Sequence, residues 1–262
     1  MDSTLLKRRA LVCGGSQGIG LASGVALAER GAIITLFARN KDRLERALES
    51  LPTPAGQEHG FLVADFDDMP QVAACMKAGL ESGKTYQILI NNSGGPPGGP
   101  VIEAHRNEFI IAFNRHLLVS QTLVQNLLPG MIHAGFGRIV NIISTSVKQP
   151  LVGLGVSNTI RGAVANWAKT LASEVAVHGI TVNNVLPGAT ETARLEALLK
   201  ARAQKSGESE EHHADLMKAA IPIRRFAQPE EIAAAVAFLC SPSAAYITGI
   251  NLPVDGGRTG TL

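Results

Sequence analysis

The sequence contains few cysteines and few aromatic residues. Its three cysteines, Cys13, Cys75 and Cys240, stand far apart in no spacing typical of metal ligands. This pattern argues against a disulfide framework or a zinc site and favours a reducing, cytoplasmic compartment. Aromatic residues make up 4% of the chain and include only two tyrosines, Tyr86 and Tyr246. Any chemistry that requires a phenol therefore has two candidates.

An excess of either charge and a long hydrophobic run are also missing. The formal net charge is +2, so no global field attracts nucleic acid or an anionic membrane. The apolar run at 10–13 ends at two glycines and is too short for the core of a secretion signal. The run at 233–240 is less than half of the ~20 residues that span a bilayer. We expect a soluble protein with neither a nucleic-acid nor a membrane partner.

Short apolar runs alternate with longer stretches that have helical periodicity. The runs are rich in Val, Ile and Leu and are nearly continuous, which is typical of parallel strands covered by helices on both faces. The expected strands are 10–13, 33–37, 61–64, 88–90, 138–143, 180–186 and 250–254. The expected helices are 18–30, 41–51, 68–81, 103–133, 157–178 and 229–239. This order predicts one doubly wound, Rossmann-type α/β domain over residues 1–262, with seven mostly parallel strands.

Two segments stand outside this alternation. One is a Gly/Pro tract at 94–100, and the other is a charged stretch at 189–220. Both follow strands, at the sheet edge where open α/β sheets bind ligands. Because long insertions in compact domains tend to be functional, we expect 189–220 to form a substrate lid. The alternative is a solvated helical pair without a role in binding.

A glycine-rich turn follows the first expected strand. Gly14, Gly18 and Gly20 stand between that strand and a helix, where the chain turns and backbone must approach a phosphate. The amino terminus of the helix then faces the anion. This context predicts dinucleotide binding, although a glycine-rich turn can also serve packing alone.

The ends of the second and third strands indicate which dinucleotide binds. An acidic residue would accept hydrogen bonds from an unphosphorylated ribose, but the second strand ends in Arg39. A guanidinium can pair with a 2′-phosphate, so the sequence favours NADP(H) over NAD(H). Asp65, after the third strand, is a candidate acceptor for the adenine amino group, or the start of a turn.

The order of these motifs resembles the short-chain dehydrogenase/reductase family over residues 5–258. The resemblance rests on the glycine turn, Asn91–Gly94, Asn183–Gly188 and Gly249–Gly257, and Ser93 stands where the family has Ala. It implies a homodimer or homotetramer that packs helices 103–133 and 157–178 across a two-fold axis. The motifs and the resemblance together predict these cofactor contacts: Gly14, Ser16, Gln17, Gly18, Ile19, Gly20, Arg39, Asp65, Phe66, Asn92, Ser93, Gly94, Arg161, Pro187, Gly188, Thr190 and Thr192.

The family's catalytic set is an Asn, a Ser and a Tyr-x-x-x-Lys pair. By resemblance, Asn114 and Ser144 match the first two, but Ser157 and Arg161 stand at the Tyr and Lys positions. A phenol has a pKa near ~10 that a neighbouring cation can lower, whereas an aliphatic hydroxyl is a much weaker acid. Arg161 lies on the helical face of Ser157 and carries a permanent charge, so it can polarise Ser157 but cannot shuttle protons.

No other residue is an evident substitute for the phenol. Tyr86 precedes a strand, at the opposite edge from the ligand crevice, and Tyr246 stands where the family often has a structural aromatic. His116 lies two residues after Asn114, about 200 degrees around a helix, which favours a packed or subunit-contact histidine. No metal site is expected.

Three functions remain open. The first is an NADP(H)-dependent oxidoreductase in which Ser144 orients a carbonyl or alcohol oxygen, Ser157 relays a proton through water held by Asn114, and Arg161 fixes the ribose. The second is a cofactor-binding sensor or inactive subunit without hydride chemistry. The third, which nothing in the sequence selects, is lyase or isomerase chemistry by Ser144 and Arg161 on an anionic substrate.

Overall fold

The seven expected strands form one parallel sheet in the computed structural model, which describes residues 4–81 and 83–261. The sheet order is β3-β2-β1-β4-β5-β6-β7, and every neighbouring pair is parallel. The bounds are β1 Arg9–Cys13, β2 Ile33–Ala38, β3 Gly60–Val63, β4 Ile88–Asn91, β5 Gly137–Ile142, β6 Ile180–Pro187 and β7 Asn251–Val254. The predicted fold class is therefore confirmed.

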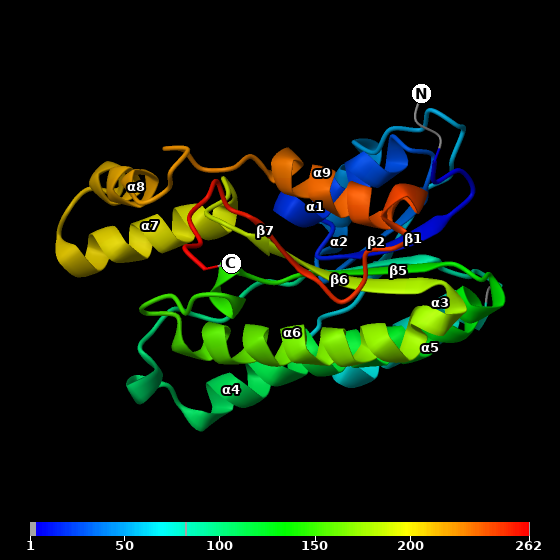
Figure 1. Cartoon of the computed structure of the whole chain (residues 1–262), viewed down its shortest axis with the longest axis horizontal. Helices are drawn as coiled ribbons and strands as arrows, with labels where there is room; N and C mark the ends of the chain where they lie inside the picture. The colour runs from blue at the N-terminus through cyan, green and yellow to red at the C-terminus, as the bar shows by residue number, and fades with distance from the viewer. Residues whose placement is uncertain (1–3, 82, 262) are drawn as a thin grey trace.

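Helices cover both faces of the sheet (Figure 1). One layer contains α1 Gly18–Ala28, α2 Lys41–Glu49 and α9 Pro229–Cys240, and the other contains α3 Met69–Glu81, α5 Val119–His133 and α6 Gly155–Val175. Alternate strand residues enter the two cores: Val12 packs with the first layer, and Leu11 packs with the second. Burial on both sides explains the continuous apolar runs. Among the described residues, no helix combines the length and the apolar character that a bilayer crossing needs.

The single helix expected over 103–133 is wrong in its extent. A short 3-10 turn at Val101–Glu103 is followed by α4 Arg106–Phe113, a π-helical turn at Asn114–Leu118, and α5. The break falls at His105, whose backbone N–H donates to Glu108 Oε2 at 2.7 Å and so begins a new helix. The expected start of α6 at Ser157 is also late. The helix begins at Gly155, where a side chain would lie 2.6 Å from the Val101 backbone.

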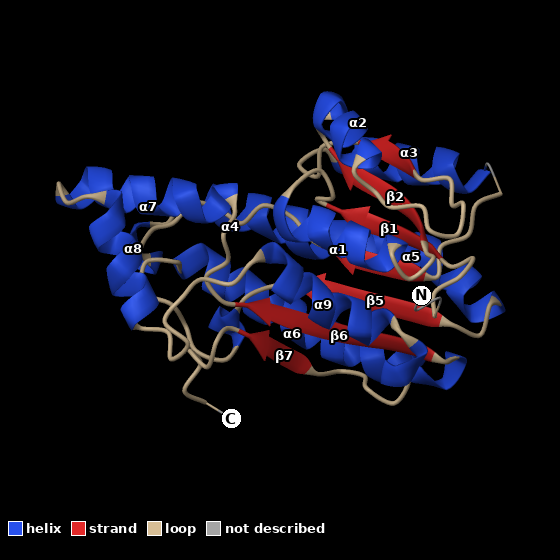
Figure 2. Cartoon of the chain, turned by 90° about the horizontal axis from the view of Figure 1, so that it is seen from above, coloured by secondary structure: helices blue, strands red, loops and turns tan. Residues whose placement is uncertain are grey.

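Two further helices extend beyond the carboxyl ends of the strands (Figure 2). They are α7 Ala193–Ser206 and α8 Glu210–Ala219, and we call them the α7–α8 arm. The arm has a small apolar core, which consists of Leu195, Leu199, Ala214, Ile221 and Phe226. The segment 189–220 thus contains two packed helices, and its role as a substrate lid stays a prediction.

A ladder of asparagine side chains crosses four strands. The Nδ2 of Asn91 donates to Asn141 Oδ1, Asn141 donates to Asn184, and Asn184 donates to Asn251, each at 2.8 Å. These residues are also direct partners in strand register. Because a one-residue slip would break the ladder, it fixes the register of β4 to β7 beside the edge that carries the site.

Candidate active site

A cavity of about 740 Å³ opens at the carboxyl edge of the sheet. Its size lies within the range of roughly 300–1,000 Å³ that is usual for ligand sites. The cavity brings together most of the predicted site residues. Those that line it are Gly14, Ser16, Gln17, Gly18, Ile19, Arg39, Asp65, Phe66, Asn92, Ser93, Gly94, Ser144, Ser157, Arg161, Pro187, Gly188, Thr190 and Thr192. Gly20 and Asn114 are not in the lining.

The glycine turn packs tightly against itself and against Asn92, the residue that follows β4. Gly14 adopts a φ of 59°, which favours glycine, and a side chain on Gly20 would lie 2.2 Å from the Gly14 carbonyl oxygen. Gly20 therefore shapes the turn from behind rather than from the cavity. Gln17 does not cap the amino terminus of α1 with its side chain, and no acidic residue lies in the first turn. The N–H groups of that turn are available to an anionic ligand.

Two arginines line the cavity near the end of β2: Arg39, directly after the strand, and Arg43, in the first turn of α2. Arg39 Nη1 lies 3.6 Å from Asp65 Oδ2, and both side chains are largely accessible. Arg43 also lines the cavity and donates from Nη1 to Gln17 Oε1 at 3.1 Å. The sequence analysis missed Arg43, although its place is set by a visible signal: Asn40 caps α2 by accepting from the Arg43 backbone N–H at 2.9 Å.

The opposite end of the cavity holds Ser144, Ser157 and Arg161. Ser144 follows β5, and its Oγ accepts a hydrogen bond from the Ser146 N–H at 3.1 Å. Ser157 and Arg161 lie one turn apart on α6. Arg161 is only 8% exposed, and its Nη1 donates to the Ile142 carbonyl oxygen at 3.1 Å. Burial, with a smaller contribution from Arg194, lowers the pKa of Arg161 to about 10, so it stays cationic at neutral pH.

His116 and Ser93 form a buried pair next to this end. His116 lies in the π-helical turn that Asn114 begins, and its Nδ1 is 2.7 Å from Ser93 Oγ. Burial, followed by the charges of Arg161 and Arg115, lowers the pKa of His116 to about 2. The imidazole is therefore neutral. His116 Nε2 has no hydrogen-bond partner in the described part of the chain and borders a second cavity of about 20 Å³, which Arg161 also lines.

Two other arginines at the cavity escaped the sequence analysis. Arg115 donates from Nε to Asp67 Oδ1 at 2.7 Å, and this pairing lowers the pKa of Asp67. Arg194, in the first turn of α7, donates from Nη2 to the Pro96 carbonyl oxygen at 2.7 Å. These contacts join residues that are far apart in sequence, so no local motif predicts them. Within residues 4–81 and 83–261, no group of three His, Cys, Asp or Glu side chains is placed to hold a metal ion.

The chain is similar to known proteins over nearly its whole length. Residues 14–259 match the family model described as enoyl-(acyl carrier protein) reductase. The 3-oxoacyl-(acyl-carrier-protein) reductase of Vibrio cholerae is 33% identical over 248 residues, which cover 95% of this chain and 96% of that protein.

Solved structures extend the likeness to the whole fold. L-sorbose reductase from Gluconobacter frateurii, complexed with NADPH and L-sorbose, superposes with a TM-score of 0.93 at 33% identity, and the match covers all of both chains. A variant of actinorhodin polyketide ketoreductase with NADPH gives a TM-score of 0.90 at 32% identity, covering 97% of this chain and 98% of that one.

Proposed function

Since the chain belongs to the short-chain dehydrogenase/reductase family, we propose that it is an oxidoreductase that uses NADP(H) to interconvert a carbonyl compound and an alcohol. One observation carries the proposal: a single cavity joins the uncapped amino terminus of α1 to the hydroxyls of Ser144 and Ser157. A dinucleotide that binds at the first end would present its other half to these hydroxyls.

The residues that line the cavity fit such a cofactor. The first turn of α1 would hold the pyrophosphate, and Thr190 and Thr192 line the cavity towards the nicotinamide half. Arg39 and Arg43 would pair with a 2′-phosphate, because a guanidinium is a planar donor to phosphate oxygens. This pair supports a preference for NADP(H) over NAD(H). When bound, NADP(H) supplies or accepts the hydride.

Proton delivery to the reacting oxygen falls to Ser157, while Ser144 and Arg161 act on that oxygen without transferring a proton. Ser144, held by its bond to the Ser146 N–H, orients the carbonyl or alcohol oxygen. Ser157 relays a proton between this oxygen and water, while the nearby Arg161 charge favours the developing alkoxide. Because Arg161 has five N–H donors and only one is bonded among the described residues, it would have donors for ribose hydroxyls as well. Asn114 does not line the cavity, so its part in the relay requires a bridging water.

Parallel calorimetric titrations with NADPH, NADP, NADH and NAD test the first half of this proposal. We expect tighter binding of the phosphorylated pair. A panel of carbonyl and alcohol substrates then tests turnover, which Ser144→Ala should reduce by ~10- to 1,000-fold if the hydroxyl stabilises the transition state. Failure to bind any dinucleotide would overturn the proposal. Tight binding with no turnover would instead support a sensor or inactive subunit, which the missing Tyr and Lys also fit.

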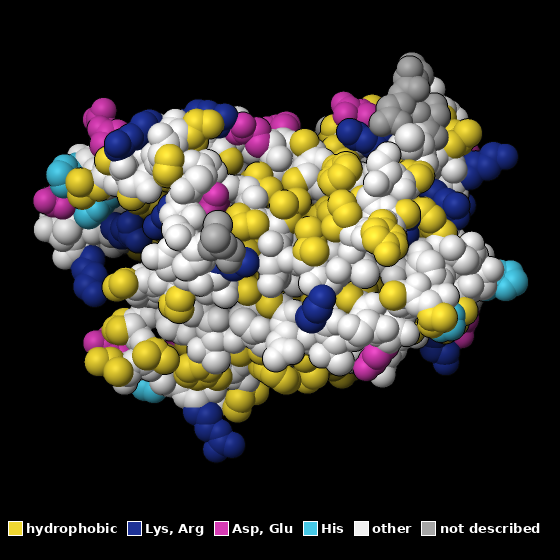
Figure 3. Space-filling model, in the orientation of Figure 1, with side chains coloured by type: hydrophobic (Ala, Val, Ile, Leu, Met, Phe, Trp, Pro, Cys, Tyr) yellow, Lys and Arg dark blue, Asp and Glu magenta, His cyan; other side chains and the backbone are white. Residues whose placement is uncertain are grey.

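We further propose a homodimer or homotetramer whose contact includes α4 and α6. Hydrophobic side chains gather along the edge of the molecule that holds these helices (Figure 3). On and beside α4, the exposed apolar residues include Ile110, Ile111, Phe113 and Leu118. Sizing by light scattering tests this, and a monomer at micromolar concentration would contradict it. Single substitutions such as Ile111→Asp would weaken the assembly.

A further inference from the structure

We propose that the substrate is anionic, and that Arg161 and Arg194 bind its carboxylate in the space above Gly95. The inference rests on the proposed oxidoreductase function and names the substrate class: carbonyl compounds that bear a carboxylate, or the corresponding hydroxy acids. The family resemblance does not imply it, because the residue at position 161 stands where the family has Lys and Arg194 belongs to the arm.

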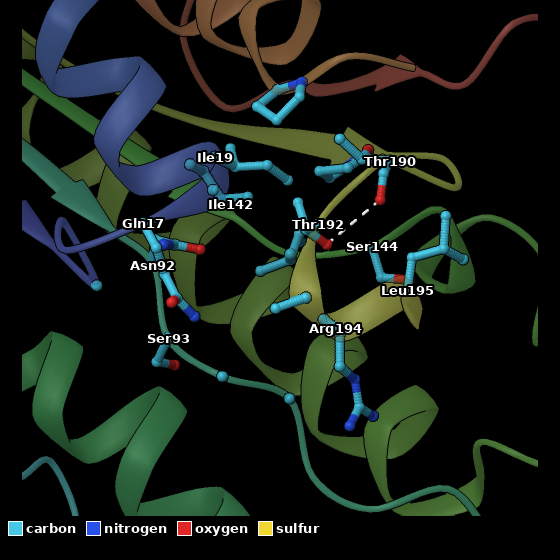
Figure 4. Close-up of a pocket in the computed structure, with 18 of the residues that line it drawn as sticks. Gln17, Ile19, Asn92, Ser93, Ile142, Ser144, Thr190, Thr192, Arg194 and Leu195 are labelled. Atoms are coloured by element: carbon cyan, nitrogen blue, oxygen red, sulfur yellow. Dashed lines mark hydrogen bonds between the residues drawn. The ribbon is translucent and has the colours of Figure 1, made fainter. Parts of the chain in front are cut away.

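The two guanidinium groups converge on one point. A methyl group built on Gly95 would lie 3.8 Å from Arg194 Nη2 and 3.9 Å from Arg161 Nη2. Arg194 Nε lies 4.0 Å from the same point, so the three nearest atoms from outside residues 94–96, within the described part of the chain, all belong to these two guanidinium groups. Figure 4 shows the Arg194 side chain directed from α7 towards the loop that follows Ser93. An anion above Gly95 would therefore meet donors from both arginines.

Neither arginine is neutralised by a carboxylate. Among the described residues, Arg161 makes one hydrogen bond, from Nη1 to the Ile142 carbonyl, and Arg194 makes one, from Nη2 to the Pro96 carbonyl. The acids that line the cavity are engaged elsewhere. Asp65 pairs with Arg39, and Glu191 accepts from Gln228 Nε2 at 2.8 Å. Arg161 therefore holds a nearly buried charge with donors still unused.

Two unneutralised cations at close range repel each other, and their proximity helps to lower the pKa of Arg161. Burying a charge without a partner is costly, and an anionic ligand removes both the burial cost and the repulsion. A carboxylate suits the site because its two oxygens match the forked donors of guanidinium groups. The cavity is also lined by the apolar side chains of Leu154, Leu195, Leu198 and Met217, which fit a short hydrocarbon body.

The position of the pair separates it from the cofactor phosphates. The 2′-phosphate and the pyrophosphate are assigned to the end of β2 and to the amino terminus of α1. Arg161 instead lies one turn from Ser157 and donates to Ile142, two residues before Ser144. A carboxylate above Gly95 therefore lies beside the hydroxyls of Ser144 and Ser157, which act on the reacting oxygen. Binding of the carboxylate there determines which end of the substrate enters.

The test compares straight-chain 2-oxo and 3-oxo acids of four to eight carbons with their methyl esters. Each compound is titrated by calorimetry into the full-length protein, with and without saturating NADP, and each is assayed for reduction by NADPH. We expect at least one acid to bind ~10- to 100-fold more tightly than its ester, the discrimination that a hydrogen-bonded charge pair provides.

Three variants and one control locate the preference. Arg194→Gln removes the charge and Arg194→Lys keeps it without the fork, so we expect the first to abolish the preference for acids and the second to retain part of it. Gly95→Ala places a methyl group between the guanidinium groups at ordinary contact distance, so it should fold normally and weaken acid binding. Arg202→Gln removes an exposed charge from the same helix and should change nothing.

The outcomes distinguish this inference from the proposed function. Esters that bind as well as acids, or acids that fail to bind at all, would overturn the inference while NADP(H) binding and turnover of neutral carbonyls stay intact. Equal weakening of acids and esters by Arg194→Gln would also overturn it. A loss of NADP affinity in Arg194→Gln would reassign the site to a cofactor phosphate. Absence of dinucleotide binding in the wild-type protein would instead defeat the proposed function, and carboxylate binding remains measurable without cofactor.

Discussion

The two ends of the cavity differ in how much of their surface comes from backbone and how much from side chains. At the cofactor end, the surface assigned to the pyrophosphate is backbone, from the glycine turn and the first turn of α1, and the side chains of Arg39 and Arg43 lie beyond it. At the substrate end, it consists of long side chains, Arg161 and Arg194, and of the α7–α8 arm. Backbone surfaces tolerate little change because a single added carbon atom collides with them. The side-chain end can change its chemistry while the sheet beneath it stays the same.

The largest expected effect comes from adding one methyl group at the cofactor end, where we expect substitutions to be tolerated least. Gly20→Ala would place a carbon 2.2 Å from the Gly14 carbonyl oxygen and 2.8 Å from Asn92 Nδ2. We expect a loss of about 1–3 kcal/mol in the free energy of unfolding, together with loss of NADPH binding, because the turn must move. Urea denaturation and fluorescence titration measure the two effects.

A matched control for this change is Gly162→Ala on α6. An added carbon there meets no neighbouring atom within 4 Å. Because alanine favours a helix over glycine, this variant should gain up to about 1 kcal/mol and keep its affinity for NADPH. Normal NADPH binding by Gly20→Ala would show that the glycine turn can adapt to an added methyl group. The difference in tolerance between the two ends of the cavity would then be disproved.

Cofactor discrimination provides the next largest effect. The double variant Arg39→Ala/Arg43→Ala removes both guanidinium groups at the end of β2 and in α2. We expect NADPH to bind ~10- to 100-fold more weakly and NADH to bind as before, because only the 2′-phosphate is affected. Calorimetric titration measures both affinities. Arg46→Ala, an exposed residue of α2 outside the cavity lining, is the control. Equal weakening of both cofactors would argue against phosphate recognition.

The His116–Ser93 pair, next to the substrate end, predicts an effect of pH on the stability of the protein. The pKa of His116 is lowered from 6.5 to about 2 in the folded protein, so below pH 6.5 the unfolded chain takes up a proton that the folded chain does not. This residue therefore costs stability as the pH falls below 6.5. At pH 5 the cost is on the order of 2 kcal/mol.

His116→Phe tests this cost. Urea denaturation at pH 7.5 and pH 5 should show a smaller loss on acidification in the variant than in the wild type. The exposed His178, in the 3-10 turn at Ala176–His178 that follows α6, supplies the control His178→Gln, which should leave the loss unchanged. An equal loss in wild type and His116→Phe would show that the imidazole accepts a proton in the folded state, and that it is available for proton transfer.

The smallest effect concerns the chain that returns from the arm to α9. Glu231 accepts from Arg225 at 2.6 Å and from the Gln228 N–H at 2.8 Å, and these contacts lower its pKa to about 2. A carboxylate with a lowered pKa stabilises the fold above its ordinary pKa and loses that effect as pH falls towards 2. Glu231→Gln should lower the melting temperature slightly at pH 7 and not at pH 2.

The neighbouring exposed residue Glu230 supplies the comparison for this change. Both acids lie in the first turn of α9, so both interact with the helix dipole. If Glu230→Gln lowers the melting temperature as much as Glu231→Gln, the effect belongs to the dipole and the ion pair with Arg225 adds nothing.

The glycine turn, Ser144, Ser157 and Arg161 were predictable from sequence, and the contribution of Arg194 from the arm was not. Strand positions follow from apolar runs, and the glycine turn follows from residues that must tolerate a positive φ or a close contact, as Gly14 and Gly20 do. Arg194 contacts the Pro96 carbonyl across 98 positions of sequence, which no local pattern encodes. The start of α4 after His105 was not predicted, because neither glycine nor proline marks it. Conversely, Pro129 lies inside α5 without ending that helix.

The asparagine ladder has a direction as well as a register. Each amide donates towards the next strand, from Asn91 in β4 to Asn251 in β7, so reversing one amide would require reversing all of them. The ladder thus leaves an acceptor at its first member: Asn91 Oδ1, which has no partner within the described residues. Asn91 borders the second cavity together with His116. A water molecule in that cavity would have to donate a hydrogen bond to Asn91 Oδ1. The donor direction of the ladder, which is the same across four strands, would therefore orient that water molecule beside the active site.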